Sequence, residues 1–150
     1  MDILNHLNEQ YEIVLSEPAN SEEEIQQLIE FSEITVPEEY LNILRQKTEI
    51  TILVKNCKCE RDICIQGAIG CIDMNEAFEM QKWIPGSLEF GDNGGGIALC
   101  YATGTEGFGI YAVDFSVRDI EDAVYLSASL ESLLVYADGF DIMRKVLFYE

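Results

Sequence analysis

The chain has 150 residues, of which 48% are hydrophobic, so it is long and apolar enough for one folded domain with its own core. Its formal net charge is −19, from 28 acidic and nine basic residues. A charge of this size repels the phosphates of nucleic acids and of anionic lipids, so we expect no nucleic-acid partner and no membrane partner.

The negative charge is concentrated in two regions of the sequence. The first 44 residues contain 11 acids and no Lys or Arg, whereas residues 45–82 contain six acidic and six basic residues. Residues 83–143 contain ten acids, with Arg118 as the only basic residue. Two acidic regions therefore flank a neutral middle.

The start of the chain does not resemble a secretory signal, because Asp2 lies where a basic residue is expected and no apolar stretch follows it. No apolar run reaches the ~18 residues of a membrane-spanning helix. Five cysteines in such a chain indicate reduced thiols rather than a disulfide framework. We therefore expect a cytoplasmic protein.

The first third of the chain has helical patterns. Apolar residues recur at intervals of three and four over residues 3–15, which predicts an amphipathic helix. Ser21 and Glu24 form a capping-box pattern, which predicts a second helix running to about Ser32 and burying Ile25, Leu28, Ile29 and Phe31. Pro37 begins a short third helix that ends near residue 46.

The remaining elements are mostly strands. The β-branched, alternating pattern predicts strands at residues 49–55, 62–66, 87–90, 97–102, 108–115 and 124–126, with residues 67–72 continuing the sheet. Helices are expected at residues 75–84 and from Ser127 or Ser129 to about residue 138, and the tail 140–150 fits a helix or a strand. The predicted fold is α+β, one domain over residues 1–150. Its antiparallel or mixed sheet of five to six strands carries N-terminal helices and a closing C-terminal helix.

The glycine cluster at residues 91–96 is best explained as a hairpin turn formed by Asn93, Gly94, Gly95 and Gly96. A phosphate-binding loop would lead into a helix and would normally include a Lys, and neither condition is met. A calcium loop would space its acidic ligands, whereas Asp92 and Asn93 are adjacent.

The cysteines invite a zinc assignment, but their spacing argues against one. Cys57 and Cys59 are separated by one residue, whereas structural zinc sites use paired knuckles with longer spacers. Cys64 lies between apolar residues of a predicted strand, and Cys71 and Cys100 are interpreted as buried small side chains. We expect no metal and no cofactor.

The catalytic inventory is small. A nucleophile activated by histidine would depend on His6, the only histidine, which we expect to face solvent. Glu38 and Glu39 are adjacent, so they point in different directions on a helix, and capping of their own first turn explains them. We therefore predict no catalytic residues and no enzymatic activity.

The acids of the second region are the candidate functional residues. Four of them, at positions 114, 119, 121 and 122, crowd a single connection between two strands. They could keep the protein in solution, or they could attract a cationic protein. The predicted partner-binding residues are Glu89, Asp92, Asp114, Asp119, Glu121 and Asp122.

Three segments in this order resemble the SUKH superfamily, which includes bacterial immunity proteins and regulators of yeast cell-wall assembly. Val36-Pro37-Glu38-Glu39-Tyr40-Leu41 is similar to the family's Leu-Pro-x-Asp-Tyr stretch. Residues 88–97 resemble its strand, glycine-rich turn and strand, and residues 124–134 resemble its closing segment. The resemblance covers residues 21–137, outside which lie the predicted first helix and the tail.

The resemblance implies an α+β protein that acts by binding and not by catalysis. Bacterial members of the family are cytoplasmic immunity proteins that neutralise a cognate toxin, often a nuclease. An acidic exterior would suit a basic nuclease domain. Two alternatives stay open at this point, a regulatory or scaffold module that binds a signalling partner and a small ligand-binding protein or enzyme.

Overall fold

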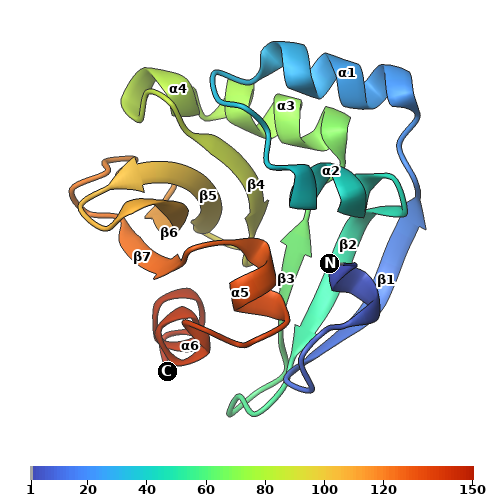
Figure 1. Ribbon diagram of the computed structural model, residues 1–150. Coiled ribbons are helices and arrows are strands. Elements are labelled where there is room, and N and C mark those ends of the chain that lie inside the picture. Colours follow the sequence, from blue (N-terminus) through green and yellow to red (C-terminus); the bar gives the residue numbers. More distant parts are fainter. Residues whose placement is uncertain (1) are drawn as a thin grey trace.

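The computed structural model describes residues 2–150 (Figure 1). One open sheet contains seven antiparallel strands, and each strand is hydrogen-bonded to the next one along the chain. The strands are β1 (Tyr11–Pro18), β2 (Lys47–Val54), β3 (Arg61–Ile65), β4 (Leu88–Asp92), β5 (Ile97–Gly104), β6 (Gly107–Asp114) and β7 (Val124–Ser127). The α+β class is confirmed, with seven strands instead of five to six.

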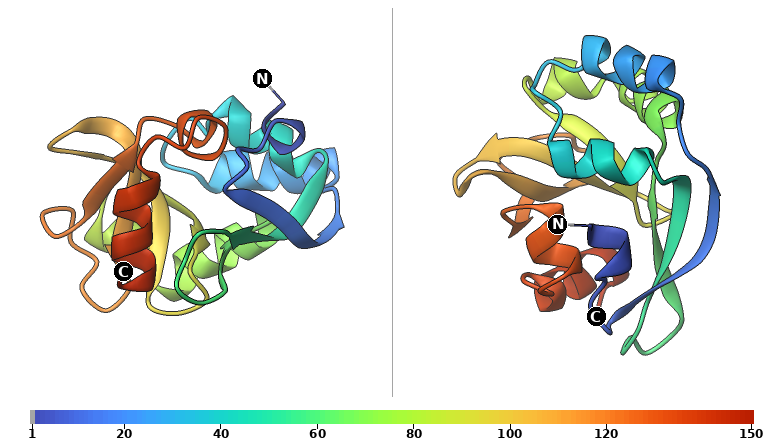
Figure 2. Two further views of the ribbon diagram at one scale, coloured as in Figure 1. Left: turned by 90° about the horizontal axis from the view of Figure 1, so that it is seen from below. Right: turned by 45° about the vertical axis from the view of Figure 1, so that its right-hand side comes forward.

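Six α-helices and a 3-10 helix surround this sheet. They are η1 (Ile3–Asn5), α1 (Glu22–Phe31), α2 (Glu38–Leu44), α3 (Ala68–Ala77), α4 (Met80–Trp83), α5 (Leu130–Leu134) and α6 (Phe140–Phe148). The sheet is strongly bent, and α2, α5 and α6 lie within its curve, whereas α1 and α3 lie side by side at one end (Figures 1 and 2).

The main core lies inside the curve. Buried apolar residues of β2–β7 pack there against η1, α2, α5 and α6. Tyr40, Phe90 and Tyr101 form a fully buried aromatic group, with ring centroids 4.7–6.5 Å apart. The hydroxyl of Tyr40 donates to the carbonyl of Gln66, so this large side chain is buried with its polar atom satisfied.

A second, smaller core covers the outer face of β5 and β6. The side chains at positions 98, 100 and 102 are small, and Met80 and Ile84 pack against them. Phe78 and Phe115 stack at its margin with ring centroids 4.2 Å apart. The core therefore connects α4 to the chain that leaves β6.

The prediction of a helix over residues 3–15 is wrong. The segment forms η1 and then β1, whose Tyr11 and Ile13 face the main core. The pairing of β1 with β2 shifts register at Val14 and again at Ser16, so β1 is bulged and its outward side chains do not alternate regularly. This edge strand is the seventh strand that the sequence did not indicate.

The prediction that residues 67–72 continue the sheet is also wrong, because they begin α3. Gly67 is the N-cap residue, and its amide donates to the carboxylate of Glu49 over 2.9 Å. A Cβ atom at Gly70 would lie 2.7 Å from that carboxylate. The glycines allow a helix to pass close to β2, and Glu79, with a φ of 50°, separates α3 from α4.

Several local predictions are confirmed. Both halves of the Ser21–Glu24 capping box are present at the start of α1, which ends at Phe31 with Ser32 as its C-cap. Ser129 caps α5. The tail forms α6 after Gly139, whose φ is 85° and where a Cβ atom would lie 1.9 Å from the carbonyl oxygen of Leu126. Within residues 2–150, none of the helices is long and apolar enough to cross a membrane.

Candidate partner-binding surface

The connection between β6 and β7, residues 115–123, is held in place by its own side chains. Asp114 Oδ1 accepts hydrogen bonds from the amide and the hydroxyl of Ser116, at 2.8 and 2.6 Å. Asp119 Oδ1 accepts from the amide of Glu121 over 3.0 Å. These short-range bonds give the connection a defined path across the surface.

Arg118 attaches the connection to α4. Its Nη1 donates to the carbonyl of Phe78 over 2.6 Å, and its guanidinium lies 5.2 Å from the centre of the Trp83 ring. The stacking of Phe78 on Phe115 adds an apolar contact between the same two segments. The only basic residue of the second acidic region is therefore engaged within the protein.

Asp114 at the end of β6 and the three acids of the connection, Asp119, Glu121 and Asp122, are all exposed. The hydrogen bonds from Ser116 hold the pKa of Asp114 below its ordinary value, so this group is charged at neutral pH. The carboxylates of Glu121 and Asp122 make no hydrogen bond or ion pair with any residue in the range 2–150. Both are available to a partner.

Trp83 contacts the same connection through Arg118 and was missed by the sequence reasoning. It is 49% exposed, and the guanidinium of Arg118 and the ammonium of Lys82 each lie 5.2 Å from the centre of its ring. The sequence placed it in a predicted helix and gave it no role, although the single Trp of the chain, two residues before a Pro-Gly turn, could have drawn attention to it. We define the Trp83 patch as Trp83, Asp114, Arg118, Asp119, Glu121 and Asp122.

The other two predicted partner-binding acids lie elsewhere. Glu89 is fully buried, so its side chain is not available to a partner, and its prediction as a surface residue is corrected here. Asp92 is half-buried at the end of β4. Gln66 Nε2 donates to both carboxylates, at 2.9 Å to Glu89 Oε1 and 3.0 Å to Asp92 Oδ2.

Burial raises the pKa of Glu89 well above its ordinary value, and the nearby charge of Asp92 acts in the same direction, whereas the Gln66 bond opposes it. Glu89 Oε2 and Gln66 Oε1 are both buried without a hydrogen-bond partner among the described residues. A carboxyl group in this setting is most stable in its neutral, protonated form. Glu89 therefore adds no charge to the surface.

The backbone of Glu89 is satisfied by a side chain. Strand β3 pairs with β4 only at Cys64–Asp92 and Ile65–Gly91, so it ends before Glu89. Asn75 of α3, which is fully buried, takes its place. It donates to the Glu89 carbonyl over 2.7 Å and accepts from the Glu89 amide over 3.0 Å.

The turn at residues 93–96 is structural, as predicted. It joins the antiparallel strands β4 and β5, and Gly94 has a φ of 75°. Asn93 Oδ1 accepts from the amides of Gly95 and Ile97, and Asn93 Nδ2 donates to the carbonyl of Leu147. The Asn93 side chain therefore fixes the turn and docks α6.

Glu38 and Glu39 have separate roles. Glu38 pairs with Arg45 over 3.0 Å on the surface. The sequence suggested that Glu39 caps the first turn of its own helix, and this is wrong. The Glu39 carboxylate accepts hydrogen bonds from the amides of Leu130 and Glu131 and from the Tyr101 hydroxyl, at 2.8–3.0 Å. It caps the N-terminus of α5 across 91 residues of sequence and closes the inner core.

The five cysteines are free thiols. Cys71 and Cys100 are buried, and burial raises the pKa of both, while burial and the surrounding carboxylates raise the pKa of Cys64 to about 11. These thiols are poor nucleophiles at neutral pH. In the part of the chain that the structure describes, residues 2–150, no three His, Cys, Asp or Glu side chains are grouped so as to hold a metal ion.

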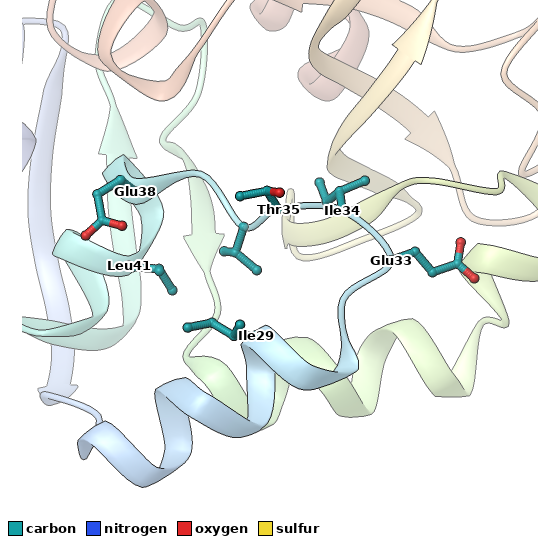
Figure 3. A pocket seen from close by; sticks show the side chains of 7 residues that line it. Ile29, Glu33, Ile34, Thr35, Glu38 and Leu41 are labelled. Carbon is teal, nitrogen blue, oxygen red and sulfur yellow. The ribbon is translucent and has the colours of Figure 1, made fainter.

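A groove of about 450 Å³ lies between α1, α2 and the segment that joins them (Figure 3). Its apolar lining includes the buried residues Val36 and Leu41 and the exposed residue Ile29. The sequence predicted Ile29 to be buried, whereas it is 39% exposed. Glu33 and Glu38 lie at its two ends.

The sequence matches no model of a known protein family and no curated protein.

Proposed function

We propose that this protein is a non-enzymatic binding protein that captures a cationic protein through the Trp83 patch. The observation that carries the proposal is the position of two unpaired carboxylates, Glu121 and Asp122, on an anchored connection beside a half-exposed tryptophan. Of the 28 acids, 22 are exposed, so the negative field extends around this patch.

The two kinds of side chain would contribute differently to binding. Exposed carboxylates accelerate encounter with a basic surface and discriminate against acidic ones. A tryptophan supplies a large apolar contact that loses little conformational entropy on binding, and Trp and Arg are enriched among residues that dominate interface energies. In this patch the Trp83 ring is already held by Arg118.

The resemblance to the SUKH superfamily supports a specific form of this proposal. The protein would be a bacterial immunity protein, acting in the cytoplasm, whose partner is a cognate toxin. A nuclease toxin presents basic residues to the phosphates of its substrate, and the carboxylates of the patch would occupy that basic surface in place of nucleic acid. Inhibition would then follow from blocking the substrate path.

The test is a calorimetric titration against the product of the adjacent gene, at about 50 and 200 mM salt. Reversal of Asp119, Glu121 and Asp122 to Lys is expected to weaken binding by more than about tenfold, and the wild-type affinity should fall as salt rises. The control reverses Glu9, Glu17 and Glu60, which are exposed near the β1 edge of the sheet and change the net charge equally. Salt-insensitive binding, or equal losses in the two triple variants, would refute the proposal.

A further inference from the structure

The groove beside α1 has an apolar interior that nothing covers. Ile29, Ile34 and Leu41 line it (Figure 3), as does Val36, and Val36 and Leu41 are buried. In a helix that buries Ile25 and Leu28, Ile29 is the apolar residue left facing this opening. A cavity of about 450 Å³ is within the range of sites that hold one bulky group.

One carboxylate lies at each end of the groove, and among the residues that the structure describes only the one at the Glu33 end is free of an ion pair, because Glu38 pairs with Arg45. Glu33 Oε1 accepts from the amide of Gly86 over 2.9 Å, and Glu38 Oε1 accepts from Arg45 Nη1 over 3.0 Å. Each carboxylate is thus held in position through one oxygen, while its Oε2 atom has no hydrogen-bond partner within residues 2–150. No Lys or Arg lines the groove.

The groove is continuous with the Trp83 patch along the chain. The bond from the Gly86 amide to Glu33 ties the segment between α1 and α2 to the turn that follows α4. Trp83 lies only three residues before Gly86, at the end of α4. A partner that covers Trp83 therefore lies within reach of the Glu33 end of the groove.

We infer that the groove is an anchoring site for a bulky aliphatic side chain of the cationic partner, flanked in the partner by a Lys or Arg residue that faces Glu33. This inference rests on the proposed function for the identity of the partner. A second copy of this chain is a poor occupant, because each copy carries a charge of −19. A neutral apolar molecule would leave the Glu33 carboxylate without a cationic partner.

The first test uses a defined probe, a short blocked peptide with one Leu between Lys residues, followed by methyl resonances of the protein. Ile29, Ile34 and Leu41 are expected to shift on titration. The same peptide with Ser in place of Leu should bind at least about fivefold more weakly, because the apolar contact is lost. Equal binding of the two peptides, or shifts spread evenly over all acidic surfaces, would overturn the inference.

Variants separate this inference from the proposed function. Ile29→Arg and Glu33→Gln are expected to weaken the leucine peptide by about threefold or more, whereas Trp83→Ala should leave it unchanged. Ile69→Arg is the matched control, since Ile69 is 38% exposed on α3 and does not line the groove. Circular dichroism checks that each variant is folded.

The adjacent gene product then completes the comparison. If Ile29→Arg weakens it by about fivefold or more relative to Ile69→Arg, the groove is part of the interface. If Ile29→Arg has no effect while reversal of the Trp83-patch acids does, the inference fails and the proposed function stands. If neither set of changes weakens binding, both fail.

Discussion

Two groups of carboxylates in this protein have opposite environments. Glu121 and Asp122 lie in solvent on the connection between β6 and β7, and no described residue pairs with them. Glu89, a residue of β4, is fully buried, and Gln66 Nε2 donates to the carboxylates of both Glu89 and Asp92. Carboxyl groups are thus exposed and unpaired in one region and buried and hydrogen-bonded in the other.

The difference teaches that a formal charge of −19 describes the composition and not the molecule. Burial raises the pKa of Glu89 well above its ordinary value, so this residue contributes a hydrogen-bonding group instead of a charge. Only exposed, unpaired carboxylates can attract a partner over a distance.

The largest effect is expected at the buried region, from Asn75→Ala. The substitution leaves the Glu89 amide buried without a partner and the Glu89 carbonyl with only the weak thiol donor of Cys71, which should lower the free energy of unfolding by about 3 kcal/mol. Urea denaturation measures it. Asn42→Ala, at an exposed position of α2, is the control. A loss below about 1 kcal/mol would show that Asn75 does not replace a strand partner.

At the surface region, Trp83→Ala should weaken binding of the cationic partner by about 2 kcal/mol, roughly 30-fold, with a smaller effect on stability. The reason is loss of the ring that Arg118 and Lys82 hold at the surface. Calorimetry gives the affinity. Tyr136→Ala removes an aromatic residue of similar exposure, 59%, and should not affect binding. Comparable losses in both variants would contradict the assignment.

The substitution Glu89→Gln tests the neutral state of the buried carboxyl. Because the folded-state pKa of Glu89 is raised, the stability that it contributes is present below its unfolded pKa of about 4.5 and is lost as pH rises through the folded-state value. The wild type should therefore lose up to about 1.4 kcal/mol per pH unit relative to Glu89→Gln above pH 5. Denaturation at pH 5, 6 and 7 measures the difference; parallel profiles would mean that Glu89 has an ordinary pKa.

The sequence predicted the parts of the fold that depend on local chemistry. The Ser21–Glu24 capping box, the Asn93–Gly94 turn and the strands from β2 to β7 follow from side-chain hydrogen bonds, positive φ angles and alternation of apolar residues. These signals act over a few residues, so they are readable without the tertiary structure.

The errors arise where distant contacts override local pattern. Residues 3–15 show helical spacing, yet Tyr11 and Ile13 face the core from a strand, and bulges break the alternation of the others. Gly67 and Gly70 resemble a strand continuation, although they allow α3 to approach Glu49. No local signal specified these contacts with β2.

The candidate site was predicted only in part. The acids of the connection are exposed as expected, because charged residues in a turn have few buried partners. Glu89 was misplaced, since its burial depends on Gln66, Asn75 and the end of β3, which lie apart in sequence. Ile29 was assigned to the core and Trp83 was given no role, because an apolar residue on a helix gives no sign of whether anything covers it.

The most direct test of the account titrates the cationic partner into two variants that each remove carboxylates without changing size, Glu89→Gln and the double variant Glu121→Gln/Asp122→Asn. At low salt, we expect the double variant to lose about three- to tenfold in affinity, mainly through a slower association rate, and Glu89→Gln to bind as the wild type does. An unchanged affinity in the double variant, or a loss in Glu89→Gln that matches it, would contradict the division of the acids into an interior group and a partner-binding group.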